Sequence, residues 1–145
     1  MLLKPPLEAI SLFYSLVFLD EKIASEASSK AWSLWKRKIK NNSNNKPEVL
    51  VVLVTHQVWF NFKKHFEHGK SNFIDSSSVL WPSEESFKIW VLFHKISVWD
   101  ELFVVIWSNI LGCSVESIAE GLSTSEGTIR YRNARALKRL GEVRV

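Results

Sequence analysis

The residues of this chain best suited to chemistry are a cluster of cations near its C-terminal end. Residues 130–145 hold six basic side chains and one acid, Glu142, a net charge of +5, whereas residues 1–129 hold 13 basic and 14 acidic side chains, a net charge of −1. Five of the six basic residues in the cluster are arginines. The planar guanidinium group suits phosphates and guanine edges, so the cluster predicts an anionic polymer as partner. A solvated helix face that binds nothing is the plainer interpretation of the charge alone.

The order of residues 112–140 predicts two short helices joined by a tight turn. Ser114 and Ser125 each precede a helical pattern, where a serine hydroxyl can accept a hydrogen bond from an unpaired backbone amide. The turn is expected at Gly121–Thr124. Apolar residues at helical spacing are expected to face inward: Ile118, Ala119, Leu122, Ile129, Ala136, Leu137 and Leu140. A short helix, a tight turn and a second helix with cationic flanks form the helix-turn-helix that fits a DNA major groove.

Two sets of DNA-contacting residues are predicted in the second of these helices. Residues of its first turns would approach base edges: Ser125, Glu126, Thr128, Arg130 and Tyr131. Residues further along would mainly hold phosphates, giving affinity and salt dependence with little sequence choice: Arg132, Arg135, Lys138 and Arg139. Replacing Arg135 by alanine is therefore expected to weaken binding on all DNA sequences alike and to lower the salt slope by about one.

Enzyme chemistry is not predicted. His65 and His68 form a His-x-x-His pair, which is too little for a metal site without cysteine or acidic ligands in register. No glycine-rich phosphate loop and no plausible catalytic triad stand out, so we expect no cofactor and no metal. Asp100 and Glu101 are interpreted as a helix start on an exposed face. The one cysteine, Cys113, excludes an intrachain disulfide, fits a reducing cytosol and is expected to be buried.

Helical periodicity is frequent along the chain and strand signals are weak, which predicts an all-α fold. Apolar residues recur at helical spacing in residues 7–19, 22–40, 48–66 and 99–110, and a further helix is expected from Ser83 to a break near Ser97. A chain of 145 residues is long enough for two very small domains. We predict two helical domains, residues 1–70 and 83–145, joined by a polar linker of residues 71–82, with the helix-turn-helix in the second domain.

The apolar run Ala9–Leu19 has the composition of a signal peptide. A proline pair opens the run, acidic residues close it, and no clear small-x-small cleavage site follows, so a helix is the preferred interpretation. Two further apolar runs, Val49–Val54 and Leu102–Trp107, are too short to cross a bilayer. The sequence therefore predicts a cytoplasmic protein without a membrane partner.

Residues 118–140 resemble the C-terminal domain of bacterial sigma factors, most closely the small two-domain, extracytoplasmic-function type. In that family Ile-Ala-x-x-Leu is followed by Ser-x-Gly-Thr-Val, and the last helix closes with Arg-Ala-Leu-x-x-Leu. Those places are taken here by Ile118, Ala119, Leu122, Ser125, Gly127, Thr128, Ile129, Arg135, Ala136, Leu137 and Leu140. The resemblance implies binding to double-stranded promoter DNA, transcription initiation with core RNA polymerase, and an anti-sigma protein as a further partner.

A weaker resemblance extends upstream. A helix ending in Ala31–Trp35, a polar loop and a helix carrying Thr55–Lys64 follow the order of the family's N-terminal domain, which binds the polymerase clamp and helps open the downstream promoter element. The loop Asn41–Asn45 falls where such factors hold a flipped-out base, which amide side chains could hydrogen-bond; a plain solvated connector is the alternative. Three aromatic residues could stack on exposed bases, although core packing explains at least two of them: Trp59, Phe60 and Phe62.

The chain departs from the family pattern in its clamp-binding helix, in its last helix and in Leu102–Trp107, which lacks the basic residue often found there. The clamp-binding helix usually carries an acidic residue and a glutamine, but alignment on Trp35 puts Ser25 and Ser28 near those places, with Ala31 after them. The negative, hydrogen-bonding face of that helix is therefore eroded. In the last helix Asn133 replaces a usual leucine, which is expected to loosen packing or to leave an amide in need of a partner.

Two other interpretations stay open. Regulators of the LuxR/GerE type share the Ile-Ala-x-x-Leu-x-x-Ser-x-Gly-Thr pattern and often end near Leu-Gly, as Leu140–Gly141 does here; such a protein would bind a palindrome as a dimer, and its N-terminal half would dimerise or sense a signal. A sigma mimic would instead occupy an anti-sigma protein or another regulator. The eroded clamp face and the seven tryptophans favour that interpretation, because aromatic side chains anchor protein interfaces.

Overall fold

The computed structural model describes residues 1–41, 44, 46–63, 81 and 83–143, and all regular structure within these ranges is helical. The predicted all-α class is therefore confirmed. In chain order the elements are α1 (Pro6–Phe18), α2 (Glu21–Asn41), α3 (Pro47–Phe62), α4 (Glu84–Ile96), α5 (Trp99–Val104), the π-helix η3 (Val105–Ile110), α6 (Val115–Leu122) and α7 (Glu126–Val143).

Local signals set the helix boundaries in the first half of the chain and at α4. Helices α1 and α3 each have proline in the first turn, where its fixed φ suits a helix start. The Asp20 carboxylate accepts hydrogen bonds from the amides of Lys22 and Ile23 at 3.0 and 3.2 Å and so caps α2. The Ser83 hydroxyl accepts one from the Ser86 amide at 3.0 Å, as the sequence predicts.

The predicted break near Ser97 is present, and the helix that follows it changes type. Ser97 ends α4, and α5 begins at Trp99. At the end of η3 the Leu111 amide donates to the carbonyl of Ile106, five residues earlier, at 2.8 Å. Apolar periodicity predicts a helix over this stretch but does not distinguish π from α hydrogen bonding.

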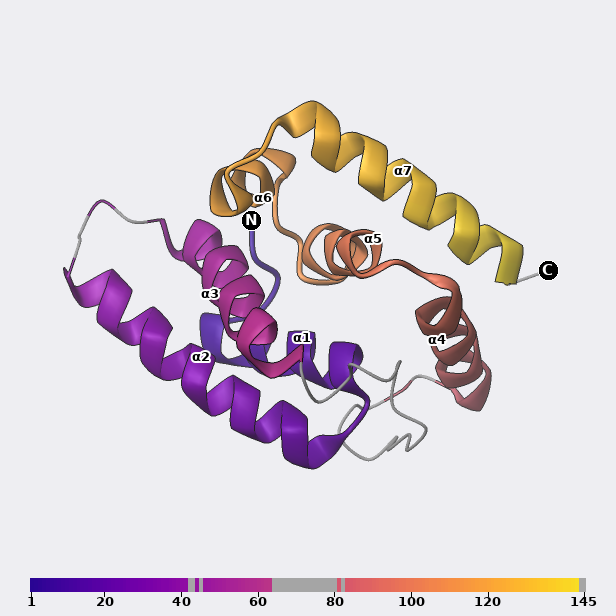
Figure 1. Ribbon diagram of the computed structural model, residues 1–145, viewed down its shortest axis with the longest axis horizontal. Helices are drawn as coiled ribbons and strands as arrows, with labels where there is room; N and C mark the ends of the chain where they lie inside the picture. The colour runs from indigo at the N-terminus through magenta and orange to yellow at the C-terminus, as the bar shows by residue number, and fades with distance from the viewer. Residues whose placement is uncertain (42–43, 45, 64–80, 82, 144–145) are drawn as a thin grey trace.

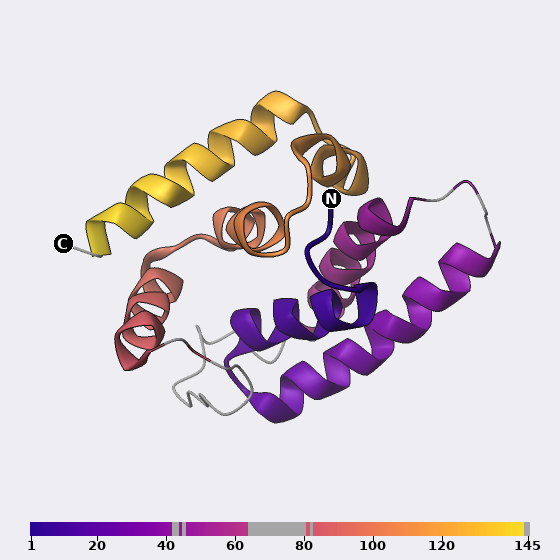
Figure 2. The ribbon, with the colours of Figure 1, turned by 180° about the vertical axis from the view of Figure 1, so that it is seen from behind.

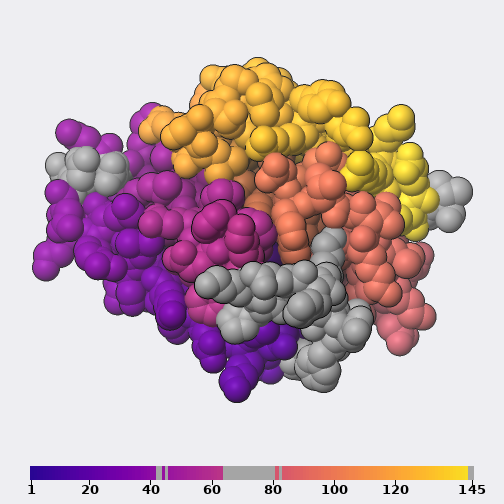
Figure 3. Space-filling view, viewed as in Figure 1, coloured from indigo at the N-terminus to yellow at the C-terminus, as the bar shows by residue number. Residues whose placement is uncertain are grey.

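The helices form two groups that pack against each other (Figure 1 and Figure 2). Helices α1, α2 and α3 pack together, α5 and α4 pack against α7, and α6 packs between α3 and α7. The N-terminus lies beside the start of α6 (Figure 1). In the space-filling view α6 and α7 form one edge of the molecule, with the outer side of α7 uncovered (Figure 3).

One hydrophobic core includes residues from both predicted domains. The Trp107 ring is fully buried, stacks on Phe13 with ring centroids 5.4 Å apart, and donates its indole N–H to the Thr55 hydroxyl at 3.0 Å. The Trp90 indole likewise donates to the carbonyl of Leu16 at 3.0 Å. Stacked aromatic pairs add about 0.5–1.5 kcal/mol beyond the area they bury. The division into two domains stays a prediction. The two halves of the chain are in extensive contact.

Some predictions fall on residues that the structure does not describe. Residues 64–66 of the third predicted helix lie outside the described ranges, as does the predicted linker apart from Trp81. Among the described helices, none has both the length and the apolar character needed to cross a membrane.

Candidate nucleic-acid interface

Two serine caps define the start of α6 and of α7, as predicted. The Ser114 hydroxyl accepts from the Ser117 amide at 3.1 Å, and the Ser125 hydroxyl accepts from the Thr128 amide at 3.1 Å. Helix α6 ends at Leu122, and Ser123 after it adopts the left-handed conformation at φ 54° and begins the turn into α7. We call α6, this turn and α7 (Val115–Val143) the α6–turn–α7 unit.

The predicted inward-facing residues of this unit are buried or half-buried with one exception. Ile118, Ala119, Ile129 and Ala136 are buried, and Leu122 and Leu140 are half-buried against the core. Leu137 is 42% exposed, so its predicted inward orientation is wrong. It follows Ala136, which takes the inward position, and the helical rotation of one residue turns Leu137 toward solvent.

The residues predicted to approach base edges lie on the accessible side of α7. Ser125, Glu126, Arg130 and Tyr131 are exposed, and Thr128 is half-buried. The Arg130 guanidinium donates to the Glu126 carboxylate one turn earlier at 3.1 Å. The structure therefore brings these five side chains together over the first two turns of the helix.

The residues predicted to hold phosphates are divided by the tertiary structure. Arg132 lies 3.8 Å from the Asp100 carboxylate, whereas Arg135 and Arg139 lie 3.4 and 3.3 Å from the two carboxylate oxygens of Glu101. Lys138 is exposed and makes no ion pair within the described part of the chain. Three of the four predicted phosphate ligands are thus already paired with acids of α5.

The role of Glu101 was not predicted. Its side chain is 9% exposed, so the expectation that it lies on an exposed face is wrong, while the expectation for the neighbouring Asp100, 60% exposed, is correct. The contact with Arg139 has ion-pair distance without hydrogen-bond geometry, since Glu101 Oε1 has no hydrogen-bond partner. Helical spacing does not separate the two acids, because Asp100 stands three and four residues before buried Phe103 and Val104 just as Glu101 stands three and four residues before buried Val104 and Val105.

The exposed Tyr131 side chain is held by Arg135. The Arg135 guanidinium donates to the Tyr131 hydroxyl at 3.1 Å and lies 5.6 Å from the centre of its ring. Arg135 also contacts Glu101. It therefore links this buried carboxylate to Tyr131, an exposed residue of the predicted interface.

Asn133 has the partner that its polar amide requires. Its side-chain oxygen accepts from the Asn109 amide at 2.7 Å. The replacement of the usual leucine is thus matched by a second amide on η3, which lies beside α7.

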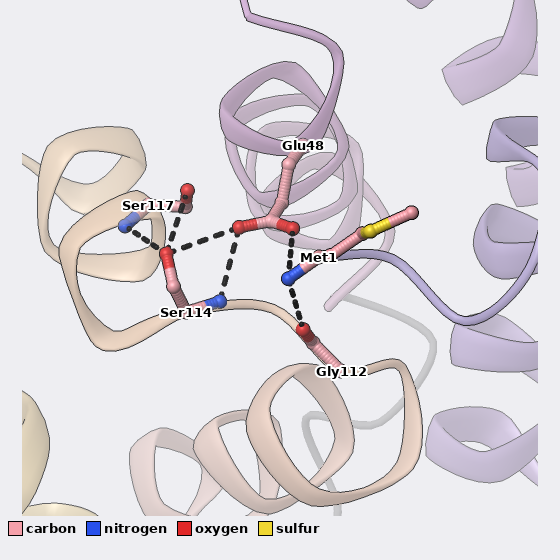
Figure 4. Close-up of polar contacts among 5 residues, drawn as sticks. All are labelled: Met1, Glu48, Gly112, Ser114 and Ser117. Carbon is pink, nitrogen blue, oxygen red and sulfur yellow. Dashed lines mark hydrogen bonds and ion pairs between the residues drawn. The ribbon is translucent and has the colours of Figure 1, made fainter.

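A polar seam joins the start of α6 to the start of α3 (Figure 4). One oxygen of the Glu48 carboxylate accepts from the Ser114 amide at 3.0 Å and from the Ser114 hydroxyl at 3.1 Å. The other oxygen lies 3.0 Å from the Met1 ammonium, which also donates to the Gly112 carbonyl at 3.0 Å. Burial alone would raise the pKa of Glu48, but its interactions with Ser117, with the Ser114 amide and with the terminal ammonium lower it from 4.5 to about 2.

The far end of α6 is held on α3 by close packing. A Cβ added at Gly121 would lie 2.8 Å from a methyl carbon of Val52 and 3.1 Å from the carbonyl oxygen of Val49. Such distances leave no room for a side chain. An exposed ion pair, Lys46–Glu120 at 3.5 Å, flanks this contact. We call the contacts of Glu48, Val49 and Val52 with α6 the α3–α6 seam.

A hollow of about 340 Å³ lies next to the seam, between α3, α5, the turn and α7. His56, Phe103, Ser123 and Arg132 line it, together with Asp100. Burial lowers the pKa of His56, with opposing contributions from Asp100, which raises it, and Arg132, which lowers it. The neutral imidazole of His56 adds no charge beside the ion pair of Asp100 and Arg132.

In the N-terminal half, the residues that the sequence analysis singled out differ in their exposure. Ser25 is exposed and Ser28 is half-buried, and both line a groove of about 430 Å³ between α1 and α2, whereas Ala31 is buried. Trp59 and Phe62 are buried. Core packing therefore explains two of the three aromatic residues, as expected.

Phe60 is the third aromatic residue and is 54% exposed, with the Lys63 ammonium 4.0 Å from the centre of its ring. Of the polar loop, Asn41 is the exposed last residue of α2, and residues 42, 43 and 45 lie outside the described ranges. The predicted base-holding role of that loop stays a prediction.

The predictions about metal and cysteine chemistry have different outcomes. His65 and His68 lie outside the described residues, and the described part of the chain has no group of three potential metal ligands. Cys113 is buried, as predicted. Burial, with a smaller contribution from Glu48, raises the pKa of its thiol to about 12, so the reactive thiolate is scarce at neutral pH.

The chain is similar over almost its whole length to one solved protein. It aligns with the co-crystal structure of the sigma factor RpoE in complex with the anti-sigma factor NepR from Bartonella quintana, with a TM-score of 0.72 and 18% sequence identity, covering 95% of this chain and 91% of that chain. The chain has a sigma-factor-like fold. No protein-family model matches the sequence, and no curated protein matches it.

Proposed function

We propose that this chain is a cytoplasmic, sigma-factor-like transcription regulator that binds double-stranded promoter DNA through the α6–turn–α7 unit, acting as a helix-turn-helix. The observation that carries the proposal is the exposed start of α7. Ser125, Glu126, Arg130 and Tyr131 lie together there, on the outer edge of a fold that is sigma-factor-like over 95% of the chain.

The chemistry of this surface suits DNA. Arginine reads guanine, and a carboxylate accepts from the amino group of cytosine, so Arg130 and Glu126 are suited to base edges. Lys138, two turns further along, is suited to a backbone phosphate. Serine and threonine at the start of α7 add short donors that reach either base edges or phosphates.

Contact with core RNA polymerase is the second part of the proposal, and α2 is the helix that would make it. Ser25 and Ser28 line the groove between α1 and α2, and Trp32 lines it as well. Hydroxyl groups hydrogen-bond a partner without adding charge, so this contact is expected to be weaker than one made through an acidic residue.

The sigma mimic is a second candidate, favoured by the ion pairs of α7. Arg132, Arg135 and Arg139 are paired with acids of the same chain, which reduces the free positive charge available for DNA. The similar structure is that of a sigma factor with an anti-sigma protein bound. A mimic would bind an anti-sigma protein and neither polymerase nor DNA.

The deciding experiment mixes the full-length protein with core RNA polymerase, with an anti-sigma protein, and with a library of random duplexes. A complex with polymerase on size exclusion, together with selective recovery of a duplex family, supports the proposed regulator. Binding to the anti-sigma protein alone supports the mimic and rejects the regulator.

Two variants of α7 test which residues read the DNA. Arg130→Ala should change the selected sequence at one or two neighbouring positions, because Arg130 would contact a base edge. Lys138→Ala removes another exposed cation of the same helix and should lower affinity for all sequences alike. If both variants changed affinity uniformly, the assignment of Arg130 to base reading would be wrong.

A further inference from the structure

The hollow between α3, α5, the turn and α7 brings opposite charges and apolar rings into one small space. Asp100 of α5 and Arg132 of α7 line it, together with the buried rings of Phe103 and Trp107. Its volume of about 340 Å³ lies near the lower end of the range of about 300–1,000 Å³ that small-molecule sites occupy. A ligand of this hollow is therefore small, and it meets both charged and apolar groups.

The two charged side chains of the hollow have unused hydrogen-bonding capacity. The Arg132 side chain is 29% exposed, and its guanidinium lies 3.8 Å from the Asp100 carboxylate, beyond hydrogen-bond distance. Within the described part of the chain this is the one polar contact of Arg132, so its five N–H donors remain available to a ligand. An ion pair of this kind is worth about 1 kcal/mol or less, so a ligand displaces it at little cost.

Neutral polar groups complete the lining. Burial lowers the pKa of His56, whose ring nitrogens make no hydrogen bond with any described residue. A neutral imidazole accepts a hydrogen bond at one nitrogen and donates one at the other. Ser123 and Thr124 line the hollow from the turn, and their hydroxyls can donate or accept. The hollow thus offers an anion, a cation and neutral partners for a small polar molecule.

We propose that this hollow binds a free α-amino acid with an apolar side chain. Such a molecule carries a carboxylate and an ammonium on one carbon atom, and the adjacent Arg132 and Asp100 are complementary to those two charges. Its apolar side chain packs against Phe103 and Leu122, which also line the hollow. The inference goes beyond the proposed function and does not depend on DNA binding.

A ligand with a single charge suits the hollow less well. A phosphate or a simple carboxylate that binds Arg132 meets the negative Asp100 only 3.8 Å from that guanidinium, and like charges repel at such a distance. An amine that binds Asp100 meets the positive Arg132 in the same way. A zwitterion compensates both groups at once, which favours an amino acid over an anion or a cation.

The residues that line the hollow come from parts of the chain that are far apart in sequence. His56 lies in α3, Asp100 in α5, Ser123 in the turn and Arg132 in α7. The site is therefore assembled only when the chain is folded. A ligand that binds the folded state alone raises its stability by mass action, so thermal unfolding reports on binding.

The experiment screens the common L-amino acids by thermal unfolding of the full-length protein and measures the affinity of the best one by calorimetry. Two analogues of that amino acid follow. Its amide lacks the negative charge, and the carboxylic acid without the amino group lacks the positive charge. Inorganic phosphate is the control for a plain anion site.

Variants locate the binding and have matched controls. Arg132→Gln and Asp100→Asn each remove one charge of the hollow, whereas Lys46→Gln and Glu120→Gln remove the same charges from an exposed ion pair outside it. Thr124→Phe keeps both charges and fills the hollow. Thermal unfolding without ligand confirms that each variant is folded.

Both analogues and all three variants of the hollow should lower affinity about tenfold or more, while the two controls outside it bind like the parent protein. Equal affinity for the amino acid and for the acid without the amino group, or for inorganic phosphate, would indicate a plain anion site and overturn the proposal. Binding that the variants of the hollow leave unchanged would place the ligand elsewhere and also overturn it. The same holds if no amino acid binds with a Kd below about 10 mM.

Discussion

Two carboxylates contact the α6–turn–α7 unit and its cap in different ways. Glu101 lies in α5, within the same half of the chain, and pairs with two arginines of α7. Glu48 lies in α3, in the other half, and binds the first turn of α6. The first contact joins elements of the same half of the chain, whereas the second joins the two halves. Glu101 therefore stabilises the packing of α7 on α5, and Glu48 stabilises the packing of α6 on α3.

The cations of α7 also differ from one another. Arg135 and Arg139 lie beside Glu101, and Arg132 lies beside Asp100, so two acids of α5 offset part of the charge of these three arginines. Lys138 points to solvent with its charge uncompensated. The cluster that looks uniformly cationic in sequence is therefore divided into arginines paired with acids of α5 and a lysine whose charge is free to attract a polyanion.

The largest effect is expected from Glu101→Ala. Removing a carboxylate that is 9% exposed leaves the partly buried Arg139 without its acid and opens a gap beside α7, which should destabilise the protein by about 2–3 kcal/mol. The exposed pair of Asp100 and Arg132 is the control, and Asp100→Ala should cost about 1 kcal/mol or less. Urea unfolding followed by tryptophan fluorescence measures both. Equal losses would show that burial does not distinguish the two acids.

The next effect concerns Glu48 and depends on pH. Because folding lowers the pKa of Glu48 from 4.5 to about 2, its ionised form stabilises the folded state at pH values above 4.5, and that stabilisation is lost as the pH falls toward 2. Glu48→Gln should therefore be less stable than the parent protein at neutral pH, by about 1–3 kcal/mol, with the difference vanishing in acid. A difference independent of pH would contradict the assignment.

A smaller effect separates the two sides of α7 in DNA binding. Lys138→Ala should lower the salt slope of binding by about one, since it removes an uncompensated cation. Arg139→Ala should change the slope less, because Glu101 already takes up that charge. Arg135 also pairs with Glu101, so Arg135→Ala is expected to lower the salt slope by less than one. Titrations at several salt concentrations measure the slopes, and equal slopes for the three variants would remove the distinction.

The smallest effect is expected at the contact between α7 and η3. Asn133→Leu loses the hydrogen bond to Asn109 but buries more apolar surface, and Asn109 is exposed enough to bond to water instead. The two changes oppose each other, so the shift in stability should stay within about 1 kcal/mol. A loss well beyond that range, seen by thermal unfolding, would show that the amide pair itself holds the two helices together.

Much of the fold follows from local sequence signals. Ser83, Ser114 and Ser125 cap the helices that they precede, and the break at Ser97 lies where the pattern predicts it. Caps depend on residues three positions apart, so sequence order alone contains the information. The burial of Trp59 and Phe62, with Phe60 left exposed, follows the same helical spacing.

Only the tertiary structure shows which side chains from distant parts of the sequence contact each other. Glu101 and Arg135 are 34 positions apart, and Glu48 and Ser114 are 66 apart, and no local pattern shows that they meet. Periodicity indicates which side of a helix is buried, but only packing determines which neighbour covers it. Amino-acid order thus predicted the type and place of the cationic helix, while three-dimensional packing decided which of its charges remain free.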